Sequence, residues 1–375
     1  MLRTFQFRLQ PNVAQTAELQ RVLVDNCETY NAALQERREA WKLQRKSITY
    51  RDQQNEITEL RKDSAFQWMA CDIQRDPLRR ADRAFKAFFR RCKTGQKPGF
   101  PRFRARRRYD SFSFSASTVR EKSIRIPNIG DIRMRGGRPA AGQPKLVTVK
   151  RDGNRWTVSI VCDIGEAPAK RVVSNPIGID VGITDLATLS DGTTIENPRW
   201  TRKHEHRIAA ASRVLARKQK RSNNRSRARQ ALRRAHQKAM NARTNYLHHV
   251  SKWLLNNYDL IAHEDLKICN MAKNPHLAKS IMDAAWGILI YQLTYKAEKA
   301  GRWVVPVNPR GTSIRCSGCG EPVAKTLADR QHNCACGVSL GRDHNAAINI
   351  LALGHSAAGL APSKSMQASL GKLCI

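Results

Sequence analysis

The feature that most constrains this chain is a group of cysteines followed closely by an acidic residue. Four cysteines fall within 21 positions near the C-terminus: Cys316, Cys319, Cys334 and Cys336. This spacing predicts tetrahedral zinc ligation of the closed, structural kind. The second pair is one residue shorter than usual, and His332 is an alternative fourth ligand. A predicted helix that carries Asp343 follows at once, so the cluster is expected to hold this carboxylate in place.

The charge balance favours a polyanionic partner. The 375 residues include 67 Lys plus Arg against 31 Asp plus Glu, a formal charge of +36. Nucleic acid explains this excess better than a merely basic surface, and a membrane surface is the weaker alternative. No run of about 18 apolar residues and no standard signal peptide is present. The six other cysteines are scattered singly, so we expect a soluble protein of the reducing cytoplasm.

The first half of the chain predicts a β-rich unit with a helical insertion. Apolar and polar residues alternate from Phe5 to Leu9, the period of a half-buried strand. Helical spacing then extends over residues 12–92. Short alternating segments follow from about 97 to 172, with a hairpin turn expected at Asp152-Gly153.

The second half predicts alternating strands and helices. Four apolar segments are predicted strands: 177–183, 186–189, 259–264 and 303–307. A long helical stretch is expected from 200 to 257. A further helix is expected to place six residues on one face: Met282, Trp286, Leu289, Ile290, Leu293 and Ala297. This alternation implies a sheet with parallel members.

Three acidic residues occupy positions from which they can converge. Asp180 lies within one apolar strand, Glu264 ends another, and Asp343 begins a helix. Neighbouring strands are about 4.8 Å apart, so the first two carboxylates can meet. Oxygen-only ligation suits magnesium or manganese, and two such ions support phosphodiester hydrolysis. The plainer interpretation gives each acid an ordinary structural role: Asp180 is a turn residue, Glu264 ends a strand and Asp343 is a helix N-cap. Asp185 and Asp265 are expected to face away.

Several motifs resemble those of the TnpB family, the RNA-guided nucleases of insertion sequences related to compact type V CRISPR effectors. Three segments are similar to its RuvC motifs: GIDVGITDLA at 178–187, HEDL at 263–266 and RDHNAAINI at 342–350. KPGFPRF at 97–103 resembles an element of the family's β-rich wedge domain. The resemblance implies an α+β multidomain protein with an RNase H-like (RuvC) nuclease domain. Asp180, Glu264 and Asp343 would be its catalytic, magnesium-binding triad. Gly341 stands where the family often has a further acid.

The resemblance also implies a domain organisation. A β-rich wedge domain is expected at 1–10 and 97–172, with a helical recognition domain at 11–96. The RuvC domain is expected at 173–310 and 338–354, with a zinc ribbon inserted at 311–337. Residues 355–375 are expected to form a flexible tail.

Two basic segments are candidates for nucleic-acid binding. Residues 202–243 contain 15 Lys plus Arg and one acid, enough to neutralise a phosphate backbone without reading sequence. The positions singled out there are Arg217, Lys218, Lys220 and Arg221. A solvated or partly disordered charge run is the alternative. The second segment contains Arg102, Arg104, Arg106, Arg107 and Arg108, interleaved with aromatic residues available for stacking: Phe100, Phe103 and Tyr109.

Together these features predict an RNA-guided DNA endonuclease of an insertion sequence. Its expected partners are a transposon-end guide RNA and double-stranded target DNA with an adjacent motif, held by a monomeric ribonucleoprotein. We expect it in the prokaryotic cytoplasm, associated with the nucleoid during action. Three alternatives remain: a nuclease-inactive RNA-guided repressor, an RNA-independent RNase H-like transposase, and a nucleic-acid-binding protein without activity.

Overall fold

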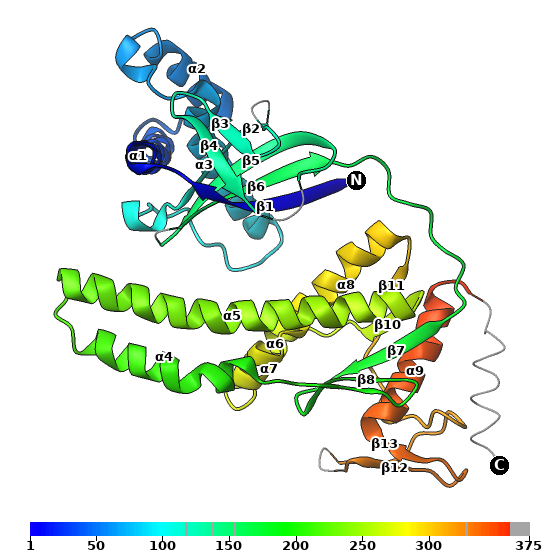
Figure 1. Cartoon of the computed structure of the whole chain (residues 1–375). Coiled ribbons are helices and arrows are strands. Elements are labelled where there is room, and N and C mark those ends of the chain that lie inside the picture. Colours follow the sequence, from blue (N-terminus) through cyan, green and yellow to red (C-terminus); the bar gives the residue numbers. More distant parts are fainter. Residues whose placement is uncertain (117–118, 137–138, 154, 327–328, 361–375) are drawn as a thin grey trace. The chain divides into compact units, whose positions relative to one another are not determined.

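The computed structural model describes residues 1–116, 119–136, 139–153, 155–326 and 329–360 (Figure 1). The chain divides into two compact units, the first ending at Glu166 and the second beginning at Ala167. Most of the predicted tail, with Cys374, lies outside the described residues. Its first residues were predicted wrongly, because the last helix continues through Ala357.

The first unit is built on a six-stranded sheet whose neighbouring strands are all antiparallel, in the order β2-β5-β6-β1-β4-β3. Its strands are β1 (Leu2–Gln10), β2 (Ser111–Ser115), β3 (Ser123–Ile126), β4 (Gly130–Arg135), β5 (Gln143–Asp152) and β6 (Arg155–Asp163). The expected hairpin joins β5 and β6. Asp152 belongs to the strand, however, since it pairs with Arg155. Gly153 has the positive φ of 64° that the turn requires.

Three helices share one hydrophobic core with this sheet. They are α1 (Val13–Gln44), α2 (Tyr50–Leu60) and α3 (Cys71–Lys93), accompanied by the short helices η1 (Ser64–Phe66) and η2 (Arg106–Arg108). Phe5, Phe7 and Leu9 of β1 are buried together with Leu19 and Leu23 of α1. The helical segment therefore shares its core with the β-rich segment, and the domain boundaries within this unit stay a prediction.

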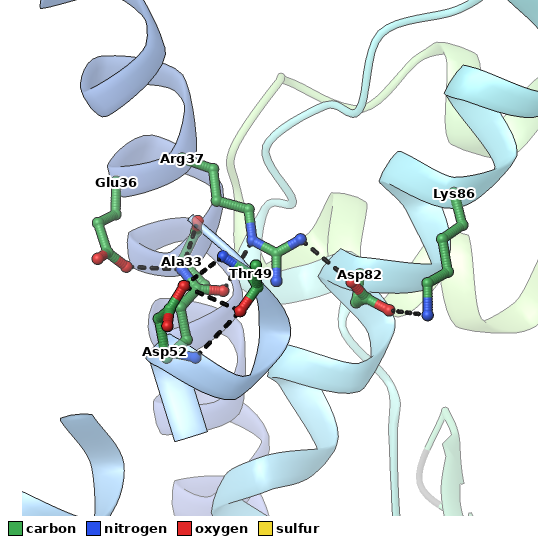
Figure 2. Close-up of polar contacts among 8 residues, drawn as sticks. Ala33, Glu36, Arg37, Thr49, Asp52, Asp82 and Lys86 are labelled. Atoms are coloured by element: carbon green, nitrogen blue, oxygen red, sulfur yellow. Dashed lines mark hydrogen bonds and ion pairs between the residues drawn. The ribbon is translucent and has the colours of Figure 1, made fainter. Parts of the chain in front are cut away.

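A buried polar network joins the three helices (Figure 2). The Arg37 guanidinium donates to Gln53 Oε1 at 2.9 Å and to Asp82 Oδ1 at 3.3 Å. The Gln53 amide donates to Ala33 O at 3.0 Å and to Glu36 Oε2 at 2.6 Å. Each helix supplies at least one partner, so the network fixes α2 between its neighbours.

The second unit contains a five-stranded mixed sheet in the order β11-β10-β7-β8-β9. Its strands are β7 (Pro176–Val181), β8 (Asp185–Leu189), β9 (Thr194–Glu196), β10 (Leu260–Glu264) and β11 (Trp303–Val307). β7, β8 and β9 are antiparallel, whereas β10 is parallel to both β7 and β11. The expectation of parallel members is confirmed.

Helices cover both faces of this sheet. They are α4 (Trp200–Ala216), α5 (Asn223–Asn257), α6 (Ile268–Met271), α7 (Ala278–Ala284), α8 (Trp286–Ala300) and α9 (Arg342–Ala357); a small hairpin, β12 (Gln331–Asn333) and β13 (Ser339–Gly341), precedes α9. Ile177 and Ile179 of β7 pack in one core with α5 and α8. The intervening Gly178 faces α9 instead, because side chains alternate along a strand.

The helical stretch expected from 200 to 257 is confirmed as two helices, α4 and α5, separated by a connection in which Arg221 has a φ of 70°. One helix prediction for this unit was wrong. The helix expected to contain Met282 is broken, because Ala285 has a φ of 56° and divides α7 from α8. Met282 is consequently 60% exposed, whereas Trp286 on α8 is buried. Within the described residues, no helix is both long and apolar enough to cross a membrane.

Candidate active site

The first two predicted acids lie at the ends of adjacent parallel strands. In the register of β7 and β10, Gly178 is opposite Ala262 and Ile179 is opposite His263. Asp180 and Glu264 are the next residues along these strands. Because side chains alternate, both acids share the face of Gly178 and Ala262.

Helix α9 lies directly on that face. A Cβ atom added to Gly178 would be 2.1 Å from Ala347 O, and one added to Gly354 would be 2.3 Å from the Ala262 Cβ. Only residues without a side chain allow the helix and strands to approach so closely. Asp343 lies one helical turn before Ala347, and Asp180 lies two residues after Gly178. Close packing therefore brings Asp343 over the end of β7.

The electrostatics of Asp180 show that the three acids interact. Burial, followed by the charges of Glu264 and Asp343, raises its pKa to about 8, and the charge of Arg342 opposes this shift. Repulsion between nearby carboxylates favours the protonated form unless a cation neutralises them. A cation bound between these carboxylates would therefore relieve their repulsion.

Glu264 and its neighbour Asp265 differ in their surroundings. Asp265 is exposed and its carboxylate pairs with Lys267 at 2.5 Å, an interaction that lowers the pKa of Asp265. Glu264 is half-buried, which raises its pKa, and accepts a hydrogen bond from the Thr312 hydroxyl at 2.5 Å. As expected, Asp265 faces solvent.

The four cysteines form a compact cluster. Their sulfur atoms all lie within 4.8 Å of one another. Cys316 Sγ is 3.6 Å from Cys336 Sγ, and the other two sulfurs are also 3.6 Å apart. A zinc ion with sulfur ligands at about 2.3 Å has sulfur–sulfur distances near 3.8 Å, whereas a disulfide bond measures about 2.05 Å. The cluster therefore fits a tetrahedral metal site.

The cluster comprises the four thiols without His332. His332 is buried, and its Nδ1 contacts Lys325 Nζ. In the described part of the chain, the cysteines are the one group of three or more His, Cys, Asp or Glu side chains close enough to share an ion. The three carboxylates of the acidic site do not form such a group, and they would have to move closer together to share an ion.

Three residues that the sequence did not single out join the cluster to α9 and Glu264. Asn345 is fully buried, accepts from the Ser317 N–H at 2.9 Å and donates to Arg315 O at 2.8 Å. Asn349 donates to Thr312 O at 2.8 Å. The sequence does contain a signal for the two asparagines. They lie four residues apart on a predicted helix, and one of them stands among small apolar residues.

Helices α4 and α5 form a basic hairpin (Figure 1). α4 contributes no buried residue, and the N-terminal half of α5 buries Ala228 and Ala239. Arg225 closes the connection by donating to Leu215 O at 3.0 Å and Lys218 O at 2.7 Å. The predicted binding residues here are all exposed: Arg217, Lys218, Lys220 and Arg221.

The second basic segment lies on the first unit and is also exposed. Its arginines are Arg102, Arg104, Arg106, Arg107 and Arg108. The backbone of Arg104 exchanges two hydrogen bonds with the Asn31 side chain, at 2.8 and 2.9 Å, and Arg106 pairs with Glu28. α1 thus anchors the segment and leaves most of its charges free for a partner.

The aromatic residues of this segment differ from one another. Phe100 and Phe103 are 47% and 50% exposed. Tyr109, in contrast, is fully buried, with the Tyr30 ring at 6.3 Å and the Arg80 guanidinium at 5.2 Å from its centroid. The prediction that Tyr109 is available for stacking was therefore wrong, because its ring fills the core of the first unit.

The fold and these sites together define a strongly basic α/β protein with a four-cysteine module and a separate acidic site. Residues 159–275 match a family model of the IS605 OrfB type described as "Probable transposase". Residues 286–350 match the Cas12f1-like TNB domain. Residues 1–46 match a helix-turn-helix model of the same OrfB group, although here they form β1 and the long helix α1.

Two relatives span nearly the whole chain. A candidate RNA-guided DNA endonuclease of Streptomyces pristinaespiralis is 34% identical, covering 95% of this chain and 90% of the relative. A protein of the same description from Escherichia coli K12, InsQ, is 32% identical and covers 95% and 93%. The chain belongs to the TnpB family of IS605 OrfB-type proteins.

A solved structure supports the fold alone. The mini-RNA-guided endonuclease CRISPR-Cas phi3 has a TM-score of 0.52 at 9% identity, with coverage of 94% of this chain and 92% of that one. At this identity the likeness concerns the arrangement of the chain and not its activity.

Proposed function

We propose that the protein is an RNA-guided DNA endonuclease of an insertion sequence, cleaving DNA at a single acidic site. The observation that carries the proposal is that Glu264 and Asp343, from distant parts of the sequence, lie near enough to Asp180 for their charges to add to its burial in raising the pKa of Asp180 to about 8. The family and the names of its two full-length relatives point to the same activity.

In this proposal the three carboxylates hold magnesium or manganese. Two bound ions would supply an activated water and stabilise the leaving 3′ oxygen of the phosphodiester. The protein itself contributes the ligands and their placement: β7 and β10 present two acids side by side, and α9 adds the third. The donor set fits such ions, since all three side chains offer oxygen.

The sheet supports an RNase H-like, RuvC type of nuclease domain. Three antiparallel strands, β9-β8-β7, are followed by the parallel strands β10 and β11, with α9 across the face that carries the acids. We propose the RuvC domain at 173–310 and 338–354 and a zinc ribbon at 311–337. The wedge would comprise 1–10 and 97–172, and the recognition helices 11–96.

The basic surfaces support nucleic-acid partners. The hairpin of α4 and α5 can follow a phosphate backbone, and the segment from Arg102 to Arg108 adds exposed cations beside Phe103. We propose a transposon-end guide RNA, a target duplex with an adjacent motif, and a monomeric ribonucleoprotein that acts on DNA in the cytoplasm. The four cysteines would hold zinc as a closed structural site.

The experiment is to purify the full chain with its native locus, sequence the bound RNA, and test that complex on matching DNA. Wild-type complex should cut in magnesium, whereas Asp180→Ala should bind RNA and fail to cut. The matched control is Asp265→Ala, an acid of the same region that faces solvent. Cleavage that survives Asp180→Ala, or is lost equally in Asp265→Ala, contradicts the assigned site. A preparation without a defined RNA would favour an RNA-independent transposase.

A further inference from the structure

The acidic site and the cysteine cluster are joined by one short turn. Thr312 is 4% exposed, and its hydroxyl donates to Glu264 Oε1 at 2.5 Å. The turn begins at Gly311, whose φ of +86° redirects the chain after β11, and it reaches the first cysteine, Cys316, five residues later. The residue that contacts Glu264 thus belongs to the segment that enters the cluster.

The opposite side of this turn is fixed to α9. Asn349 donates to the carbonyl oxygens of Thr312 and Arg315, each at 2.8 Å. Asn345 also donates to Arg315 O and accepts from the N–H of Ser317, so both ends of its buried amide are used. The turn therefore contacts Glu264 on β10 and, through the two asparagines, the helix that carries the third acid.

We propose that Thr312 is a positioning residue for Glu264, and that the turn 311–317 transmits metal occupancy of the cysteine cluster to the acidic site. The inference rests on the proposed role of Glu264 as a metal ligand. A glutamate side chain has three rotatable bonds, and a hydrogen bond to one oxygen limits its orientations while leaving the other oxygen for a cation. Such outer contacts typically change metal affinity tenfold to a hundredfold.

The alternative role for Thr312 is to close its own turn. Its hydroxyl also lies 3.1 Å from Pro309 O. A hydroxyl has one hydrogen to donate, and a carboxylate is the stronger acceptor. The two roles differ in their consequences: loss of turn closure would lower stability, whereas loss of the Glu264 contact would weaken divalent-cation binding in a folded protein.

The test measures Mn²⁺ binding to the full, zinc-loaded, RNA-free chain by electron paramagnetic resonance. Thr312→Val should weaken binding about tenfold or more, and Thr312→Ser, which keeps the hydroxyl, should stay within about threefold of wild type. The matched control is Thr326→Val, whose hydroxyl donates at 2.9 Å to the exposed Asp329 of the same module. It should bind Mn²⁺ as wild type does.

Equal affinity in wild type and Thr312→Val would overturn the positioning role, as would equal weakening in Thr312→Ser and Thr312→Val. Failure of the wild type itself to bind Mn²⁺ would refute the proposed acidic site, and this inference with it. Hydrogen exchange of α9 and β10 in each variant establishes that the fold is retained.

Transmission from the cluster is tested by a double-mutant cycle. Cys334→Ser should weaken Mn²⁺ binding several-fold in the wild-type background and add little in the Thr312→Val background, because the contact that transmits the effect is already lost. Equal effects of Cys334→Ser in both backgrounds would overturn the transmission.

Discussion

Replacing Asp180 with asparagine should stabilise the metal-free protein while abolishing cleavage. The pKa of Asp180 rises from 3.8 in the unfolded chain to about 8 in the folded protein. Between these values the folded state retains a proton that the unfolded state has lost, so the free energy of unfolding falls as pH rises from about 4 to 8. A neutral amide of the same shape avoids this penalty.

The magnitude follows from the part of the shift that lies below the working pH. At pH 7 about three pKa units contribute, and about 1.4 kcal/mol per unit sets a ceiling of about 4 kcal/mol. Water reaches the half-buried carboxylate and screens the repulsion, so we expect a gain of about 1–3 kcal/mol for Asp180→Asn. The gain should shrink as pH falls toward 4 and disappear below about pH 3, where the aspartic acid is protonated in both the folded state and the unfolded chain.

Hydrogen exchange of the β7 and α9 amides in magnesium-free buffer, with the zinc retained, is the appropriate assay, because it reports opening of this unit without requiring two-state unfolding of the whole chain. Asp265→Asn is the control, since that exposed carboxylate pairs with Lys267 and should yield no stabilisation. Added magnesium should then slow the hydrogen exchange of these amides in the wild type and leave their exchange in Asp180→Asn unchanged. Equal or faster exchange in Asp180→Asn than in wild type at pH 7 to 8 would refute the electrostatic reasoning.

Three further predictions concern packing, a buried ion pair and nucleic-acid affinity. Gly178→Ala should displace α9 and lower thermal stability by about 2 kcal/mol or more, because its Cβ would lie 2.1 Å from Ala347 O; Gly341→Ala, with nothing within 4 Å, should be tolerated. Arg37→Met should destabilise the first unit by about 1–3 kcal/mol in thermal unfolding, because Gln53 loses a partner and Asp82 keeps only its ion pair with the exposed Lys86. The α4–α5 connection has four exposed cations: Arg217, Lys218, Lys220 and Arg221. Replacing all four with alanine should weaken DNA binding and reduce the magnitude of the slope of log affinity against log salt by about three to four. An unchanged slope would exclude this surface as a DNA-binding site.

The sequence predicted the placement of the acids because local periodicity determines it. Asp180 follows Gly178 by two residues, and Glu264 ends a strand whose neighbours are apolar, so the faces of both follow from strand alternation. The contacts of Thr312, Asn345 and Asn349 could not be predicted in the same way. Their partners are a carboxylate and backbone groups that tertiary folding brings together over many residues, and no sequence spacing encodes them.

The wrong predictions share a related cause. Apolar spacing continues through Met282 and Trp286, but a left-handed Ala285 rotates the chain between them, and nothing in an alanine signals a positive φ. Tyr109 follows a run of exposed arginines, yet its ring is buried. Burial of a residue in a basic segment depends on the neighbouring helices, which the composition of the segment does not reveal.

Redirection of cleavage by the guide tests the central proposal most directly. The complex purified with its RNA is reconstituted with a guide segment of altered sequence and given magnesium and two DNA duplexes, one matching each guide. We predict that the cut moves to the newly matched duplex in wild type and in Asp265→Ala, and that Asp180→Ala cuts neither. Cleavage that continues at the original DNA sequence whatever RNA is bound would contradict RNA-guided action by this protein.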